Sequence, residues 1–316
     1  MLRDLGIVCQ TGSTGGMRYS AMLAKAMKTV APHVSVTLYH GKSLDISDIR
    51  EPLRVAGVRL RRLGRTPRAT TRIAPDATVL QRAWAACRSA FQWQRSVRLN
   101  RILRRHQVVH CAWPYGMDPP QLDIPLTFIP HDFIHSHEFG VLLYDARQWA
   151  DTQASLGKWL ARGYPIVSSD FVARELAQAF PAYEGPVSTV YLSSLHPRST
   201  GFADAGRAEA TCRRLGIAGR YILCPNNVMP HKNLGVLIGA LWHIRQRGED
   251  VRLVVVGPGT DGIRATVACP LYGDRVDDQT DWHIRGFGLV SESDLTDLML
   301  RAAVVANPSL CEAGTG

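Results

Sequence analysis

The amino-acid sequence predicts an α/β protein with two parallel, doubly wound sheets. Short apolar runs alternate with longer helical segments, the pattern of buried strands joined by covering helices. A length of 316 residues is typical of two domains. A polar stretch with proline and glycine, LHPRSTGFADAG (195–206), separates two such series of elements. We therefore expect a first domain at 1–195, a linker at 196–220 and a second domain at 221–316.

The first half begins with LGIVCQ, a short β-rich run that precedes a helical segment at 17–30. A second helix is expected at 170–180, with Asp170 as its N-cap and Pro181 as its stop. The strands expected in this half are 5–10, 34–40, 108–113, 126–132, 164–170 and 188–194.

The second half repeats the alternation over fewer residues. Helices are expected at 232–247 and 291–301, and strands at 221–227, 251–257, 282–288 and 302–309. The sequence ends at Gly316, in an expected loop that would open another helix. The second domain is therefore expected to be incomplete.

Composition excludes several classes of protein. Apolar residues make up 46% and charged residues 20% of the chain, close to the globular average, which excludes a disordered, collagen-like or coiled-coil chain. No apolar run approaches the ~20 residues that span a bilayer. The seven cysteines include no C-x-x-C pair, which favours reduced thiols in the cytoplasm over disulfides or a zinc ribbon.

The positive charge is concentrated in one segment. The net charge is +10, but Arg50–His106 alone contains fifteen arginines, no lysine and two acids. Within it, residues 81–106 predict a basic amphipathic helix with an apolar stripe of Trp84, Cys87, Phe91 and Ile102. Such a helix either lies on an anionic membrane or packs on the core with a solvated arginine face. Nucleic acid is not expected as a partner, because no recognised binding module accompanies the charge.

Two glycine clusters follow expected strands. TGSTGG (11–16) opens a helix, so it is either a phosphate-binding loop or a tight turn. GPGTDG (257–262) matches the dinucleotide pattern G-x-G-x-x-G and makes an NAD-dependent oxidoreductase a remote alternative. Pro270 restricts the helix that this alternative requires.

Three further clusters contain chemically active side chains. HDFIHSHE holds His131, His135 and His137 after a strand, and we favour substrate contact by His131 over a metal site. Lys232 opens a helix, where it suits a diphosphate or is an ordinary exposed lysine. Glu312 follows the last expected strand, either to bind sugar hydroxyls or within a simple turn.

Together these segments resemble family 4 of the GT-B glycosyltransferases, the "glycosyl transferases group 1" set. The similarity is most specific in the second half, in YILCPNNVMPHKNLGVLIGAL (221–241), RLVVVGPG (252–259) and the run 284–316. The weaker matches of the first half are TGSTGGMRYSAMLAKAM (11–27), TFIPHDF (127–133) and YPIVSSDFVARELAQAF (164–180).

The resemblance implies two Rossmann-like domains that face a cleft, with the acceptor bound by the first and a UDP- or GDP-sugar by the second. It implies retaining transfer of a mannose-, glucose- or galactose-type sugar to a glycan or lipid-linked acceptor, in surface polysaccharide or glycolipid synthesis. It implies neither a bound metal nor a permanently bound cofactor. It also implies a cytoplasmic enzyme, peripheral on the inner face of the membrane.

The resemblance further assigns roles to residues. Lys232 would hold the donor diphosphate, Glu312 would contact sugar hydroxyls, and His131 would touch the donor sugar; these are the expected catalytic residues. Backbone near phosphate or the transferred sugar is expected at Gly15, Gly16 and Gly314, and contacts near the base at Gly288, Leu289 and Val290.

The chain departs from the family pattern at two places. Asn227 stands where the family often has arginine, which removes one cation from the expected diphosphate site. A second glutamate, expected eight residues after Glu312, is absent because the sequence ends at Gly316. A truncated, non-catalytic remnant that binds nucleotide weakly is therefore the alternative to an enzyme.

Overall fold

The computed structural model describes residues 1–9, 14–41, 46–63, 95–138, 140, 143, 145–192, 204–261, 263 and 283–312. The chain divides into two compact units, the first from Met1 to Leu195 and the second from His196 to Glu312. Each unit is built around its own parallel sheet.

The first unit contains a seven-stranded sheet in the order β3-β2-β1-β4-β5-β6-β7. Every described pair of neighbouring strands is parallel. This order runs outward in both directions from β1 and β4, so the chain reverses between these two strands. The strands are β1 (Asp4–Cys9), β2 (Ser35–His40), β3 (Arg59–Arg62), β4 (Val108–Cys111), β5 (Leu126–Phe128), β6 (Tyr164–Val167) and β7 (Ser188–Thr189).

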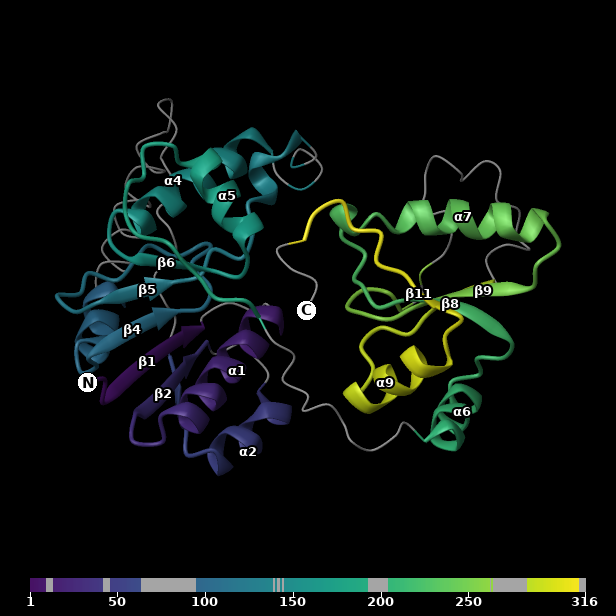
Figure 1. Cartoon of the computed structure of the whole chain (residues 1–316), viewed down its shortest axis with the longest axis horizontal. Helices are drawn as coiled ribbons and strands as arrows, with labels where there is room; N and C mark the ends of the chain where they lie inside the picture. The colour runs from purple at the N-terminus through teal and green to yellow at the C-terminus, as the bar shows by residue number, and fades with distance from the viewer. Residues whose placement is uncertain are drawn as a thin grey trace, which may run out of the picture. The chain divides into compact units, whose positions relative to one another are not determined.

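Helices cover both faces of this sheet (Figure 1). One face packs against α1 (Thr14–Val30) and α2 (Ser47–Val55), with Ile7 and Leu38 fully buried in that layer. The other face packs against the helical residues 95–103 and α4 (Ala146–Leu160), and α5 (Asp170–Ala179) continues this layer. Strands β1 and β2 are buried at every position after the first, as expected of strands that are covered on both faces.

The second unit repeats the plan with a four-stranded parallel sheet in the order β10-β9-β8-β11. Its strands are β8 (Arg220–Cys224), β9 (Val251–Val255), β10 (Ile284–Gly286) and β11 (Val304–Val305). Helix α7 (Leu234–Gln246) packs on one face, and α6 (Ala205–Arg214) and α9 (Glu292–Arg301) on the other (Figure 1). The chain reverses between β8 and β11, as it does between β1 and β4 in the first unit.

The segment expected as a linker at 196–220 contains helix α6, so this expectation was wrong for 205–214. Asp204 caps the helix by accepting hydrogen bonds from the amides of Gly206 and Arg207. The buried Asp297 of α9 accepts from the Arg207 guanidinium at 2.8 and 3.0 Å and from the Thr211 hydroxyl at 2.9 Å. The apolar signal of α6 is weak because this ion pair, rather than a stripe of large apolar residues, fixes it to α9.

Most strands and helices lie where the sequence predicts them, but the strands are shorter at their carboxyl ends. The N-cap of α5 is Ser169 rather than Asp170, because the Ser169 hydroxyl accepts from the Val172 amide. The five described cysteines are buried free thiols. In the described part of the chain, no helix has both the length and the apolar character needed to cross a bilayer.

The described end of the arginine-rich segment is a core-packed helix. Leu99 and Leu103 are buried in the first unit, and Ile102 packs against the same cluster. Arg98 and Arg101 are exposed on the other side. These residues therefore pack on the core and leave a solvated arginine face. Trp84, Cys87 and Phe91 lie outside the described residues.

Candidate functional site

Each unit places its predicted site residues after the carboxyl ends of its strands, and several of them follow the strands where the chain reverses. Open α/β sheets bind ligands at this edge, because the loops there diverge and leave a crevice. In the first unit these are the ends of β1 and β4, and in the second the ends of β8 and β11.

Gly16 lies in the first turn of α1, directly after the end of β1. A Cβ atom at Gly16 would lie 2.8 Å from the Trp113 ring, so the glycine allows this indole to cover the start of the helix. The Ser20 hydroxyl donates to the Gly16 carbonyl at 2.7 Å. Gly15 belongs to the same turn, whereas residues 11–13 of the glycine loop lie outside the described residues.

His131 is held beside this turn by two aromatic rings and one backbone hydrogen bond. Its ring lies 4.9 Å from that of Trp113 and 5.6 Å, edge to face, from that of Tyr19. Its Nε2 is 2.7 Å from the Ala112 carbonyl oxygen, which can only accept, so Nε2 carries the proton. Burial lowers the pKa of His131, and a neutral ring leaves Nδ1 as a hydrogen-bond acceptor.

The three histidines of the HDFIHSHE segment contact three different partners. His131 binds the Ala112 carbonyl, His135 Nε2 lies 2.9 Å from the Gln153 side-chain oxygen, and His137 pairs with Glu175. Their ring nitrogens therefore do not converge on one point. Among the described residues, the three histidines therefore do not form one shared ligand set.

Near His131, a chain of buried hydrogen bonds joins α1 to β4 and β5. The Tyr19 hydroxyl lies 3.2 Å from His110 Nε2, and His110 Nδ1 lies 2.9 Å from the Thr127 hydroxyl. Burial lowers the pKa of His110 to about 3 and raises that of Tyr19 to about 12. His110 is thus neutral in the folded protein at any pH above about 3.

We expect His110 to make the first unit sensitive to acid. Below the ordinary histidine pKa of about 6.5, the unfolded chain binds a proton that the folded protein does not. The free energy of unfolding should therefore fall by up to ~1.4 kcal/mol per pH unit between about pH 6.5 and 3. Urea unfolding at several pH values measures this slope, and His110→Gln should reduce it. An equal slope in both proteins would contradict the assignment.

In the second unit, polar side chains join the loops that follow β8 and β11. Asn226 donates from its side-chain amide to the Asn307 side-chain oxygen at 2.7 Å. The Leu310 amide donates to the His231 carbonyl at 2.8 Å, and the Asn233 side chain to the Pro308 carbonyl at 3.3 Å. The two strand ends are therefore fixed side by side across the reversal of the chain.

Lys232 and Glu312 meet at this edge. Lys232 ends the short 3₁₀ helix η3 (Pro230–Lys232), and Asn233 then takes a left-handed conformation with φ 53° before α7 begins. Lys232 Nζ lies 2.5 Å from Glu312 Oε1, with 15% and 27% of the two side chains exposed. The structure thus brings together, within one unit, the cation predicted for a diphosphate and the carboxylate predicted for a sugar.

The other predicted contacts of the second unit that the structure describes follow strands β8 and β10 of the same sheet. Asn227 accepts the Met229 amide at 3.0 Å and so shapes the loop after β8. Gly288 has φ 64° and follows β10, the Leu289 side chain is 67% exposed, and Val290 packs on the core. Gly314 lies outside the described residues.

The glycine turn after β9 is occupied by bonds within the fold. The Gly257 amide donates to the Gly288 carbonyl at 2.8 Å, and the Thr260 amide to the Gly257 carbonyl at 3.2 Å. A Cβ atom at Gly257 would lie 2.6 Å from the Asn226 carbonyl oxygen. These two amides already donate to carbonyl groups of the fold, so they are not available to bind the phosphates of a dinucleotide. This disfavours a dinucleotide site in the turn after β9.

Sequence reasoning missed Asn226, Asn307, Tyr19 and Trp113. The available signal for the two asparagines was their position directly after apolar strands that end at the reversal of the chain. Tyr19 and Trp113 carry no such signal, because their contact with His131 depends on how α1 crosses the sheet.

The fold is similar to that of several solved glycosyltransferase structures. HepE of Anabaena in complex with UDP and glucose has a TM-score of 0.60 at 13% identity, covering 98% of this chain and 75% of its own. Sucrose-phosphate synthase of Thermosynechococcus elongatus has a TM-score of 0.61 at 13% identity, covering 99% and 77%. The chain has the GT-B fold. WaaG, a glycosyltransferase involved in lipopolysaccharide biosynthesis, has a TM-score of 0.59 at 14% identity, covering 98% and 76%.

At these identities the likeness concerns the GT-B fold alone. No protein-family model matches the sequence. No curated protein matches it either.

Proposed function

We propose that this protein is a retaining glycosyltransferase. It transfers a hexose of the mannose, glucose or galactose type from a UDP- or GDP-sugar to a glycan or lipid-linked acceptor. The observation that carries the proposal is the contact between Lys232 and Glu312 at the strand ends of the second unit. The resemblance to family 4 and the presence of UDP and glucose in the HepE structure are consistent with it.

The charges at this edge suit a sugar diphosphate. The Lys232 ammonium lies at the start of α7, where backbone N–H groups add positive potential, so two sources of charge meet an anion. As the glycosidic bond breaks, negative charge accumulates on the leaving diphosphate, and a fixed ammonium stabilises it. Glu312 holds the ammonium in place and offers oxygens that accept from sugar hydroxyls.

His131 supplies the corresponding group of the first unit. Its neutral ring, with the proton fixed on Nε2, presents an acceptor to a sugar hydroxyl. A neutral ring also adds no charge that would compete with Lys232 for the diphosphate. Transfer by these groups is proposed to need no metal ion.

The proposal extends to location. The exposed Arg98 and Arg101 suit peripheral attachment to the anionic inner face of the membrane from the cytoplasm. Since Leu99 and Leu103 are buried in the core, this attachment would be electrostatic and reversed by salt.

The test is a calorimetric titration of the intact chain with UDP, GDP and NAD. Saturable binding of one nucleoside diphosphate, with no binding of NAD, is the expected result. Incubation with the matching nucleotide sugars and mass analysis of added glycans then identifies transfer, and proton NMR gives the anomeric configuration of the product. If the folded protein binds neither UDP nor GDP, the proposal of an enzyme is wrong and the non-catalytic remnant is favoured.

A further inference from the structure

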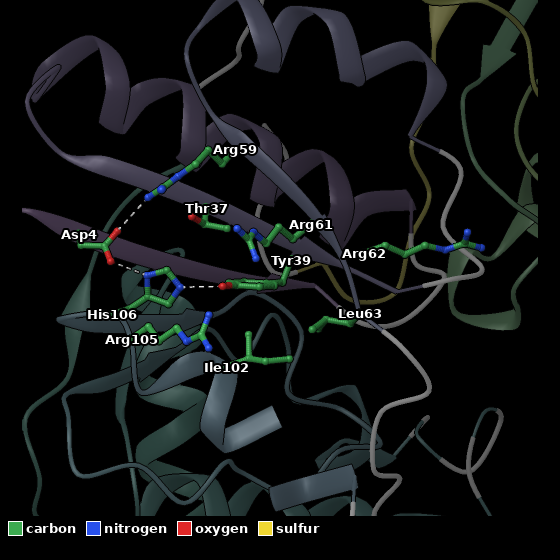
Figure 2. Close-up of a pocket in the computed structure, with 10 residues that line it drawn as sticks. All are labelled: Asp4, Thr37, Tyr39, Arg59, Arg61, Arg62, Leu63, Ile102, Arg105 and His106. Atoms are coloured by element: carbon green, nitrogen blue, oxygen red, sulfur yellow. Dashed lines mark hydrogen bonds and ion pairs between the residues drawn. The ribbon is translucent and has the colours of Figure 1, made fainter. Parts of the chain in front are cut away.

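A second candidate site lies in the first unit, on the sheet face that also packs against residues 95–103. It is a pocket of about 310 Å³ between β1, β2, β3 and the turn that follows these helical residues. A single water needs a cavity of only ~10–15 Å³, so this pocket is larger than a packing defect. Asp4 and Arg59, the first residues of β1 and β3, line it, so it extends toward the amino ends of the strands (Figure 2).

The lining is strongly cationic. It contains four arginines and a single carboxylate, that of Asp4. Asp4 is already engaged, by Arg59 at 3.6 Å and by His106 at 2.9 Å. Among the described residues, no carboxylate lies within ion-pair distance of Arg61 or Arg105. The pocket therefore holds positive charge that its own acid does not neutralise.

The floor of the pocket is preformed by a chain of three side chains. The Asp4 carboxylate accepts from His106 Nδ1, so His106 Nε2 accepts from the Tyr39 hydroxyl at 2.9 Å. The imidazole lies over Gly6, where a Cβ atom would come within 2.6 Å of its ring. A glycine in the middle of a central strand is thus required for this arrangement.

Arg61 and Arg105 approach this floor from two different elements. Figure 2 shows their guanidinium groups directed toward the Tyr39 hydroxyl, Arg61 from β3 and Arg105 from the turn after residues 95–103, while Arg62 points away. Burial raises the pKa of Tyr39, whereas the positive charges of Arg61 and Arg105 act to lower it, which supports their proximity to the hydroxyl. Because the Tyr39 hydroxyl donates its proton to His106, that proton is not available to a ligand. The hydrogen-bond donors that remain for a ligand here are the guanidinium groups of Arg61 and Arg105.

We propose that this pocket binds a phosphate-bearing ligand, with a phosphoryl or diphosphoryl group held between Arg61 and Arg105. Guanidinium groups form paired hydrogen bonds with phosphate oxygens, and a tetrahedral phosphate can bind two of them from different sides. The same group can belong to a soluble phosphate ester or to a lipid headgroup. The site is separate from the strand ends that carry Gly16 and His131, and it does not depend on the proposed transferase activity.

The test titrates the full-length chain with inorganic pyrophosphate. Lys232→Ala is present in every protein, so that the second unit does not contribute a diphosphate site. Pyrophosphate should bind saturably, and Arg61→Gln with Arg105→Gln should weaken binding at least tenfold. The matched control, Arg162→Gln with Arg174→Gln, removes the same charge from exposed positions of the first unit outside the pocket and should leave affinity unchanged.

The source of the phosphate is distinguished with vesicles. Cosedimentation with phosphatidylglycerol vesicles, against phosphatidylcholine vesicles, is measured for the same two double variants. If pyrophosphate binds weakly but the pocket variant loses at least tenfold more vesicle affinity than the control, a lipid headgroup supplies the phosphate. Equal behaviour of the two double variants with both probes would overturn the proposal.

A measurement that leaves the pocket residues unchanged covers the case in which the pocket variant does not fold. Phenylglyoxal modifies accessible arginines, and peptide mass spectrometry reports each site. Pyrophosphate should protect Arg61 and Arg105 in the Lys232→Ala protein and leave Arg98 and Arg101 unprotected. Equal modification of all four with and without pyrophosphate would contradict the site.

Discussion

Lys232→Ala is expected to weaken binding of the donor nucleoside diphosphate by about 10- to 150-fold. A hydrogen bond to a charged group contributes about 1.5–3 kcal/mol, which corresponds to this range of Kd. The rate of sugar transfer should fall further, by about 10²–10³-fold in kcat, since the ammonium is needed most when charge develops on the leaving group. Calorimetry with UDP and GDP and a transfer assay measure the two effects.

Two controls separate this role from a general loss of positive charge. Arg247→Ala removes one cation from an exposed position at the far end of α7, and should change neither quantity. Binding of the nucleoside without its phosphates should be unchanged in Lys232→Ala, because the lost contact is to the diphosphate. If nucleoside and nucleoside diphosphate lose affinity equally, Lys232 does not hold the diphosphate.

The site of the second unit was predictable because its signals are local. Lys232 is the only lysine between His196 and Glu312, and it stands between an apolar strand and a helix. Glu312 likewise follows a strand within a few residues. Since the carboxyl ends of parallel strands share an edge, both residues are expected at the same edge of the sheet. Their proximity follows from the strand order, which places β11 beside β8. The hydrogen bond between them depends on how both loops fold, which periodicity does not contain.

The cationic pocket was not predictable for the opposite reason. The sequence shows the excess of arginine between Arg50 and His106, but predicts a structure, a basic amphipathic helix, only for residues 81–106. The structure instead gathers Arg61 from an edge strand with Arg105, 44 residues later in the chain. The strand order β3-β2-β1-β4 explains why both residues line one pocket, because it returns the chain to the centre of the sheet after β3. Short strands such as RLRR also lack the apolar residues that reveal a strand.

Gly286→Ala is expected to give the largest loss of stability in the second unit. Gly286 ends β10, and a Cβ atom there would lie 1.6 Å from the Thr260 carbonyl oxygen and 2.7 Å from the Ile263 side chain. The nearest atom belongs to the backbone, so no side-chain rotation relieves the clash. Overpacking of this kind costs about 1–3 kcal/mol and occasionally more, and a backbone clash belongs at the upper end.

The loss of stability caused by Gly286→Ala should appear first in the loops and strands around Thr260, and not in the first unit. Thr260 holds the loop after β10, because its hydroxyl accepts from the Gly288 amide at 2.9 Å and donates to the Gly257 carbonyl at 2.9 Å. Displacing Thr260 therefore loosens the strand ends of β9 and β10 together. Hydrogen–deuterium exchange should accelerate in β9 and β10 and remain unchanged in β1 and β2 of the first unit.

Gly157→Ala provides the contrasting control. Gly157 lies inside α4, and a Cβ atom there would meet only an ordinary contact, 3.8 Å from the Phe180 ring. Alanine favours a helix interior over glycine by up to ~1 kcal/mol, so this variant should be as stable as the original protein or more so. If Gly286→Ala behaved like Gly157→Ala, the turn at 257–260 could not lie against β10 as described. The arrangement of loops at the proposed nucleotide-binding edge would then be wrong, since that turn fixes the position of Gly288.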